Sequence, residues 1–436
     1  MEPTGENVDL NPFDPSFWAD PYRFYPALLA GPPRRLSLFF PTILVTRYCD
    51  VVSVLGDPVR FSSCVPQLPF ISKLDPFGGA PTMLLSDPPV HTRLRRLATR
   101  YFRASTVDAL GVRIRATTRM LLDGIAAKGE FDGVLDLAVP LPVAINAEIL
   151  GVPIEDQPML KAWSDEIFAA VRRTLAIAGA FVNGSTLPAF ADVGAQPVAS
   201  PLRMIDGSIP ETNADAMAAL RDYFLREIER RKARPGGDLV SAMVSAHGRG
   251  AISRDELIAL MILLLFAGNE TTTNLIANGL LVLSSHRHRL EHLKSAPELI
   301  PRAIEEILRY DSPTQMVMRY ATGETHLAGT LIPSGAVLLV MLGAANRDPA
   351  QFPDPERFDV GRHPNQHVAF GNGIHSCIGS QLARLQGQVV IGAMLERFPA
   401  LRLRNPEAPL EYSGSLLSRG LSTLPLVTGE GRAPVT

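Results

Sequence analysis

Apolar side chains recur at intervals of three and four residues along most of the chain, and this spacing predicts a mainly helical protein. The predicted helices cover residues 106–128, 142–150, 156–174, 214–234, 254–285, 297–310 and 382–395. Shorter apolar runs predict strands at residues 36–40, 43–46, 316–321 and 336–341, and a terminal hairpin made of 417–421 and 424–426. No repeat and no break in composition divides the chain, so we expect one α+β domain over residues 1–436, mainly α with small β-sheets.

Two stretches lack a helical period. Residues 61–85 contain prolines and glycines and predict a long irregular loop, whose apolar side chains favour a lid over a substrate pocket. Residues 176–212 are rich in Ala, Gly, Pro and Ser and predict a mobile connection between two helices. A lid, a membrane-touching patch and a tolerated insertion remain open for this second stretch.

The composition is that of a soluble globular protein, with 46% hydrophobic residues, 20% charged residues and a net charge of −2. It has no basic footprint for nucleic acid. Three cysteines without a CxxC pair argue against a disulfide framework and indicate a reducing cytoplasm. The N-terminus has no secretion-signal pattern, and the longest apolar run, at 257–268, is too short to span a bilayer. We therefore expect a cytoplasmic protein without a membrane anchor.

A glycine-rich turn carries the most specific chemistry, Phe370-Gly371-Asn372-Gly373-Ile374-His375-Ser376-Cys377-Ile378-Gly379. Its glycines allow positive φ angles and let the backbone lie close to a flat object. An apolar helical pattern follows directly, so amide donors and the positive end of a helix dipole favour a thiolate at Cys377. Such a thiolate suits haem iron. A buried structural cysteine at a helix start is the alternative for Cys377 taken alone.

Two cations are predicted to converge at residues 87–95, Asp87-Pro88-Pro89-Val90-His91-Thr92-Arg93-Leu94-Arg95. The prolines fit a helix start, and His91 and Arg95 lie four residues apart on one helical face. A pair of anions would fit between them, whereas a solvated basic face is the alternative.

The predicted helix 254–285 begins with a capping box of Ser253 and Glu256 and is about 45 Å long. In its middle lies Ala267-Gly268-Asn269-Glu270-Thr271-Thr272-Thr273, which is locally unfavourable for a helix. Gly268 leaves room beside the helix, and Thr271 is able to bond back to an upstream carbonyl and open a groove. Glu270 and Thr271 then offer a proton relay. A polar notch packed against another helix is the alternative.

Further along, Glu306 and Arg309 have the i, i+3 spacing of an ion pair, and Asp311-Ser312-Pro313 ends their helix. Taken together, five separated motifs resemble those of soluble bacterial-type cytochromes P-450, in the same order. They are Asp-Pro-Pro-x-His-x-x-x-Arg at 87–95, Ala-Gly-x-Glu-Thr-Thr at 267–272, Glu-x-x-Arg at 306–309, Pro-Glu-Arg-Phe at 355–358 and the cysteine loop at 370–379. The resemblance covers about residues 20–426 and implies a single triangular fold whose long central helix crosses the haem.

The resemblance implies a role for each matching residue. Cys377 is expected to be the axial ligand of haem b, and Glu270 and Thr271 the acid–alcohol pair that delivers protons for dioxygen reduction. Many relatives have Asp where Glu270 stands, and the additional methylene puts the relay geometry in doubt. The charge triad expected to support the cysteine loop is Glu306, Arg309 and Arg357. The remaining cofactor-binding residues are expected to be His91, Arg95, Arg319 and His375 at the propionates, with Phe370, Gly371, Gly379, Ala267 and Gly268.

The implied reaction converts substrate–H, O₂, two electrons and two protons into substrate–OH and water. The sequence shows no flavin or iron–sulfur module, so the expected electron donors are a ferredoxin and its reductase. Basic residues such as Arg384 and Arg362 are expected to steer the ferredoxin toward the protein. The protein is expected to be a monomer. Its substrate is expected to be a large apolar molecule such as a terpenoid, steroid, fatty acid or polyketide. Candidate pocket residues, besides the 61–85 lid, are Leu264, Ala267, Met316, Val317, Leu417 and Ser418.

Three other interpretations compete with this one. A peroxide-driven haem enzyme of the same fold would tolerate loss of the Glu270–Thr271 pair, whose presence argues against it. A non-catalytic haem or ligand-binding protein would bind ligand without turnover. A zinc site built on His375 and Cys377 lacks a second ligand pair nearby in the sequence.

Overall fold

The computed structural model describes residues 17, 19–36, 41–64, 75–167, 212–285, 287–412 and 417–429. The middle of the predicted 61–85 lid, almost all of the 176–212 connection and the end of the predicted 36–40 strand lie outside the described residues.

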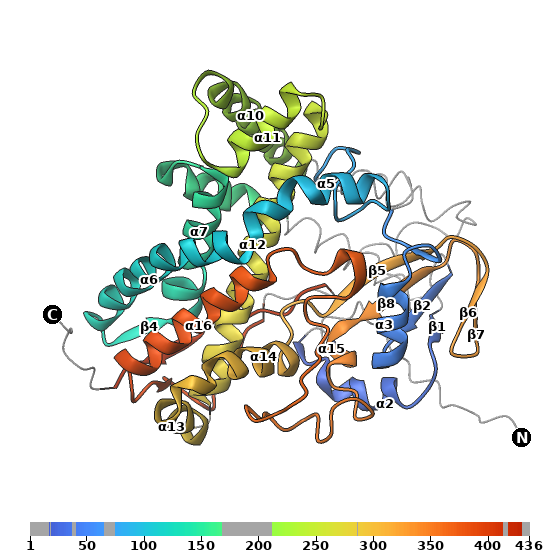
Figure 1. Ribbon diagram of the computed structural model, residues 1–436. Helices are drawn as coiled ribbons and strands as arrows, with labels where there is room; N and C mark the ends of the chain where they lie inside the picture. The colour runs from blue at the N-terminus through green and yellow to red at the C-terminus, as the bar shows by residue number, and fades with distance from the viewer. Residues whose placement is uncertain are drawn as a thin grey trace, which may run out of the picture.

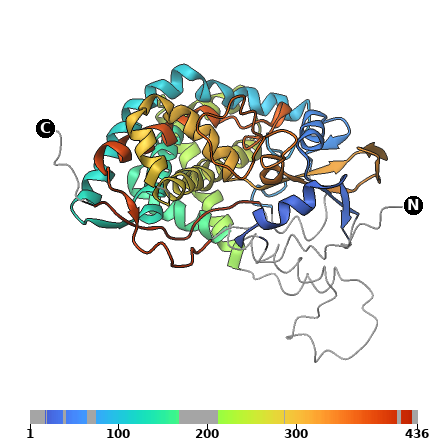
Figure 2. The ribbon, with the colours of Figure 1, turned by 90° about the horizontal axis from the view of Figure 1, so that it is seen from below.

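Helices dominate the structure, as the periodicity predicts, and they gather on one side of the molecule while the largest sheet lies on the other (Figure 1). Figure 2, turned by 90°, shows the same separation. The described helices are α2 Tyr25–Leu29, α3 Tyr48–Gly56, α5 Val90–Thr99, α6 Ala104–Ala126, α7 Pro140–Leu150, α10 Thr212–Ala233, α11 Leu239–Gly248, α12 Arg254–Ser284, α13 Arg287–Ser295, α14 Ile300–Tyr310, α15 Leu342–Ala345 and α16 Ser380–Arg397. Helices α6, α7, α10, α12, α14 and α16 match the predicted ranges within a few residues, and the described part of the predicted helix 156–174 is helical over 157–167. Helices α2, α3, α11, α13 and α15 were not predicted.

Helix α12 crosses the middle of the fold and packs against α7, α14 and α16 (Figure 1). The predicted capping box is present, because the Ser253 hydroxyl accepts the Glu256 amide at 3.2 Å and the Glu256 carboxylate accepts the Ser253 amide at 2.9 Å. By length and composition alone, α12 and the helical stretch Gly133–Leu150 would each cross a membrane. Because most of each stretch is buried within the protein, both are typical of core helices.

The strands in the described part of the chain form three small sheets. The largest has the order β1-β2-β8-β5-β3, in which β2 and β8 are parallel and the other neighbours antiparallel. The second has the order β4-β10-β9, and the third pairs β6 with β7. Their bounds are β1 Arg34–Leu36, β2 Thr42–Val45, β3 Phe61–Ser62, β4 Glu130–Asp132, β5 Met316–Ala321, β6 Thr325–Leu327, β7 Thr330–Ile332, β8 Val337–Met341, β9 Arg402–Leu403 and β10 Pro425–Val427.

The predicted terminal hairpin is wrong. Strand β10 pairs with β4 and β9, and Ser418 instead forms an isolated bridge with Thr314, just before β5. Both stretches have the apolar composition of strands, but their partners lie far away in the sequence and leave no local signal. The consequence for function is that the C-terminal segment 417–421 lies beside the strand that carries Arg319.

Candidate active site

The cysteine loop is shaped by its glycines. Gly371 and Gly373 have φ angles of 70° and 71°, which side-chain-bearing residues rarely adopt. A Cβ on Gly373 would also lie 2.4 Å from the backbone oxygen of Leu55 in α3. The Cys377 amide donates to the Phe370 oxygen at 2.8 Å and closes the loop just before α16 begins. The backbone conformation and this hydrogen bond therefore define the position of Cys377 within the loop.

The Cys377 side chain is accessible although it lies deep in the protein. Burial raises the pKa of the Cys377 thiol, and the Gly379 amide and the guanidinium groups of Arg95 and Arg384 lower it only in part. The amide and the charges favour a thiolate, as expected, but desolvation opposes it. A cation bound at the sulfur would supply the missing stabilisation.

Four cationic or polar side chains predicted to hold an anion gather next to this loop. The rings of His91 and His375 lie 4.3 Å apart, and Arg95 donates to the Ser376 oxygen at 2.7 Å. Three buried ring nitrogens, both of His91 and Nε2 of His375, have no hydrogen-bond partner in the described part of the chain. Arg319, on β5, is 8% exposed and donates to the Met318 oxygen. Orphaned buried donors of this kind fit the two carboxylates of a haem.

The electrostatics of this cluster agree with an anion partner. Burial and then the charge of Arg319 lower the pKa of His375 to about 4, and burial and Arg95 lower the pKa of His91. Burial lowers the pKa of Arg319 to about 10. Each shift disfavours positive charge, mainly through desolvation, and neighbouring cations add to the shift for the two histidines. Two propionate carboxylates would reverse this repulsion.

On α12, Ala267 is exposed while its neighbour Phe266 is only 6% exposed, so this turn borders open space. The Thr271 hydroxyl donates to the Ala267 oxygen at 2.8 Å, as predicted for an upstream carbonyl. The Glu270 carboxylate is half-buried and accepts a hydrogen bond from Ser418 at 2.7 Å. An acid and a hydroxyl therefore lie together beside open space.

Gly268 makes room for a neighbouring helix and not, as predicted, for the cofactor. A Cβ on Gly268 would lie 2.9 Å from three side-chain atoms of Asn146 on α7, so the space it leaves holds Asn146. The Asn146 amide donates to the oxygens of Leu264 and Leu265 and to Asn269, at 3.0 to 3.1 Å. The prediction for Gly268 is corrected, and the polar notch is packed against another helix on this side. Sequence reasoning did not identify Asn146, because a lone Asn in a helix carries no specific signal.

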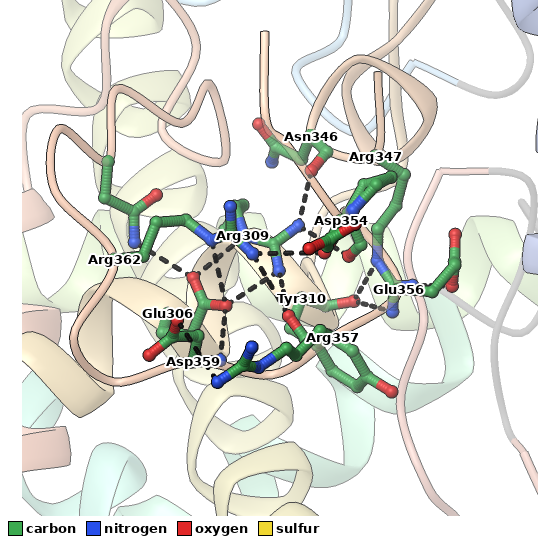
Figure 3. A network of polar contacts seen from close by, with 12 residues as sticks. Glu306, Arg309, Tyr310, Asn346, Arg347, Asp354, Glu356, Arg357, Asp359 and Arg362 are labelled. Atoms are coloured by element: carbon green, nitrogen blue, oxygen red, sulfur yellow. Dashed lines mark hydrogen bonds and ion pairs between the residues drawn. The ribbon is translucent and has the colours of Figure 1, made fainter. Parts of the chain in front are cut away.

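The predicted charge triad is confirmed for two members and wrong for the third (Figure 3). Glu306 and Arg309 form a fully buried ion pair at 2.7 Å, and Arg309 also donates to the backbone oxygens of Asn346, Pro355 and Arg357. The Arg357 side chain is 71% exposed and lies 4.0 Å from Asp359.

Arg362 takes the third place. Its side chain is 9% exposed and lies 3.3 Å from the Glu306 carboxylate. Arg362 is therefore no steering residue for a redox partner, in contrast to the prediction. Arg384, the other predicted steering residue, is partly exposed but is held by a two-point ion pair with Glu305 and lies over the Phe370 ring.

The predicted pocket residues divide between two faces. Leu264 and Ala267 share the helical face of Thr271. Val317 shares the strand face of Arg319 and packs against the apolar cluster around β2 and β8. Met316 points the other way on β5, is 1% exposed and packs with Tyr25 and Leu28. Leu417 packs against the same cluster. These contacts correct the predictions for Met316 and Leu417, while Ser418 reaches the site as the partner of Glu270.

No group of three or more His, Cys, Asp or Glu side chains is arranged around a common metal position in the described ranges. A metal at Cys377 would therefore have one protein ligand. A haem suits such a site, because its macrocycle supplies the other metal ligands and its carboxylates pair with the neighbouring cations.

Comparisons with known proteins agree with this donor set. The sequence model for Cytochrome P450 matches residues 38–422, and the chain therefore belongs to the cytochrome P450 family. Membership makes it a monooxygenase with a haem-thiolate cofactor that receives electrons from a redox partner. The predicted family, fold class, enzyme class and cofactor are confirmed.

The relatives match over nearly their whole length. Cytochrome P450 107B1 of Saccharopolyspora erythraea is 36% identical over 440 residues, covering 98% of this chain and 99% of that protein. A vitamin D(3) 25-hydroxylase of Pseudonocardia autotrophica is 36% identical, with 97% of each protein covered. The crystal structure of CYP109E1 from Bacillus megaterium in complex with testosterone has a TM-score of 0.79 and 32% identity, covering 95% of this chain and 99% of that chain.

Proposed function

We propose that this cytochrome P450 inserts one oxygen atom of O₂ into a large apolar substrate, by hydroxylation or epoxidation, with electrons from a ferredoxin and its reductase. The observation that supports this proposal best is the pairing of two half-sites. One is an accessible thiol beside orphaned imidazole donors, and the other is the Glu270–Thr271 turn beside open space.

Each half-site has a distinct chemical task. Haem b, when bound, supplies dioxygen activation and oxygen transfer, which no side chain performs. Cys377 would hold its iron, and His91, Arg95, Arg319 and His375 would hold its propionates. Glu270 and the Thr271 hydroxyl would pass on the two protons that the reaction takes up, as substrate–H, O₂, two electrons and two protons become substrate–OH and water.

The apolar substrate class is supported by the residues that share a face with the site. Leu264, Ala267 and Val317 are apolar. Among the described residues on the α12 face of Thr271 and the β5 face of Arg319, Arg319 is the one cation, and it is assigned to a propionate. The relatives point the same way, since the vitamin D(3) hydroxylase and the testosterone complex both involve steroid-like molecules. Terpenoids, fatty acids and polyketides belong to the same apolar class.

A ferredoxin is expected to dock near Cys377, in the cytoplasm, on a monomeric enzyme. Arg95 on α5 contacts the cysteine loop, and the exposed residues Arg96, on the same helix, and Arg100, which follows its end, are the next cations along the chain. These two arginines, together with Arg384, replace Arg362 as the steering charges for an acidic partner.

The absorption spectrum of the reduced protein under carbon monoxide tests the first half-site. We expect the Soret band of a thiolate-ligated haem, and a band without thiolate character would overturn the role of Cys377. Testosterone and vitamin D3, titrated as probes, are expected to shift the spin state of the haem.

The Thr271→Ala variant tests the second half-site. With a bacterial ferredoxin, its reductase and the better-binding probe, we expect product formed per NADPH to fall about tenfold, because a positioned proton donor is lost. Thr271→Ser, which keeps the hydroxyl, is the matched control and is expected to retain most of the coupling. Full coupling in Thr271→Ala would contradict the relay.

A further inference from the structure

The carboxylate of Glu270 has one side-chain hydrogen-bond partner in the part of the chain that the structure describes. This partner is the Ser418 hydroxyl, at 2.7 Å from Oε1 and 148 residues away in the sequence. Thr271, the neighbour of Glu270, donates to the Ala267 oxygen instead. The acid and the alcohol of the relay are therefore held by different parts of the chain.

Ser418 itself is held in place by the residues on either side of it. The Gln315 amide donates to the Leu417 oxygen, and the Arg419 amide donates to the Pro313 oxygen, both at 2.9 Å. The Arg419 guanidinium is 3.2 Å from Asp311. Because these contacts lie on both sides of Ser418, its hydroxyl has little freedom to move away from α12.

The same segment contacts α12 a second time, one turn from Glu270. A Cβ on Gly420 would lie 2.0 Å from Oδ1 of Asn274, so only glycine allows this close approach. Residues 270 and 274 share a helical face. The segment therefore rests on α12 through Gly420, and the Ser418–Glu270 bond is not the contact that brings the two together.

We propose that Ser418 is a positioning residue for Glu270. Its hydroxyl binds one carboxylate oxygen and thereby sets the direction in which the other faces the Thr271 turn. Glutamate has one methylene more than aspartate, and its additional torsion makes such an anchor useful. The proposal rests on the proposed proton delivery by Glu270 and Thr271, and it assigns no contact between Ser418 and substrate or haem.

The test needs neither a ferredoxin nor a substrate. Haem-loaded enzyme is reduced in air by a photoexcited ruthenium complex, and the consumed O₂ is divided into H₂O₂ (two electrons and two protons) and water (four electrons and four protons). We expect Ser418→Ala to raise the H₂O₂ fraction about threefold, because misplaced proton donors lose part of their contribution. Ser418→Thr, which keeps the hydroxyl, is expected to remain near wild type.

Two further variants separate positioning from packing. Ser422→Ala is the matched control in the same segment. Its backbone amide still donates to the Glu411 oxygen, so the H₂O₂ fraction is expected to stay unchanged. Ser418→Val has nearly the same shape as Ser418→Thr but lacks the hydroxyl, and it is expected to raise the fraction as Ser418→Ala does. This second variant decides the question if Ser418→Ala does not fold.

A double variant gives the decisive comparison. If Ser418 acts through Glu270, then Ser418→Ala adds nothing to the H₂O₂ fraction of Glu270→Gln. An unchanged fraction in Ser418→Ala, or a full additional rise in the double variant, overturns the proposal. Failure to accept electrons from any ferredoxin would contradict the proposed function but leaves this light-driven comparison intact.

Discussion

The two sides of the haem site are held together over very different distances in the sequence. On the cysteine side, the loop closes between Phe370 and Cys377, and its shape depends on glycines within the same ten residues. On the α12 side, Glu270 is held by Ser418 from 148 residues away, and Asn269 contacts Asn146 at a separation of 123 residues. The loop that carries Cys377 is a local structure, whereas the α12 side is an assembly of three distant elements.

This difference follows from what each side must do. A metal ligand is useful only at one position, and a short loop closed by backbone bonds defines that position with little dependence on the rest of the chain. The α12 side must leave space for a substrate while still placing an acid and a hydroxyl. Separate elements allow the space and the polar groups to change independently.

Replacing the ligand should break the cysteine side completely. We expect Cys377→Ser to abolish monooxygenase turnover, because the thiolate donation that favours O–O cleavage is lost. The fold should survive, since the loop is closed by the residue 377 amide and not by the side chain. The reduced carbon monoxide spectrum and the thermal unfolding midpoint measure the two effects. Retained turnover in Cys377→Ser would contradict the assignment.

The support behind the cysteine loop should be the next most sensitive feature. Arg362→Ala removes one of the two cations of Glu306 but leaves Arg309, and loss of such a charged hydrogen bond costs about 1.5–3 kcal/mol in the free energy of unfolding. Arg357→Ala is the matched control, because its exposed guanidinium should contribute no more than about 0.5 kcal/mol. Urea unfolding measures both, and equal losses would show that Arg357 belongs to the triad after all.

These two arginines also show where prediction from sequence succeeds and where it fails. The Glu306–Arg309 pair was predictable because helical spacing places the two side chains on one face. The third member was not, because Arg357 and Arg362 both lie in an irregular, proline-punctuated coil that has no period. Only the path of that coil decides which guanidinium turns inward.

Most of the fold was predictable for the same reason, since helical periods and caps are local signals. The helix start at 87–95 and the loop at 370–379, which the structure brings together, were predictable as well. The partners of Glu270 and Gly268 were not, because Ser418 and Asn146 reach α12 from distant segments. Met316 and Leu417 were placed in the pocket from sequence position, whereas strand alternation and core packing turn both away from it.

A pH experiment sharpens the comparison on the cysteine side. In the haem-free protein, His375 faces His91, Arg95, Arg319 and Asp87, and its pKa lies at about 4 against an ordinary value of 6.5. Because the unfolded state binds the proton more readily, folding stability should fall as the pH is lowered from about 6.5 toward about 4. His375→Gln should flatten this part of the pH dependence in urea unfolding midpoints.

Haem loading provides the control for that experiment. Propionate carboxylates beside His375 would favour the imidazolium, so the loaded protein should lose less stability over the same pH range. An identical loss with and without haem, or an unchanged pH dependence in His375→Gln, would show that the imidazole does not face an anion.

The smallest expected effect probes the α12 side, where Gly268 and Asn146 are in contact. Gly268→Ala gains helix propensity of up to about 1 kcal/mol. It also forces the Asn146 amide away from its three acceptors, and overpacking of this kind costs about 1–3 kcal/mol. The variant should therefore be less stable by about 1 kcal/mol. In an Asn146→Ala background the clash disappears, and the same substitution should stabilise the protein. This reversal of sign, measured by urea unfolding, identifies a contact between two helices, whereas a loss in both backgrounds would return Gly268 to the haem face.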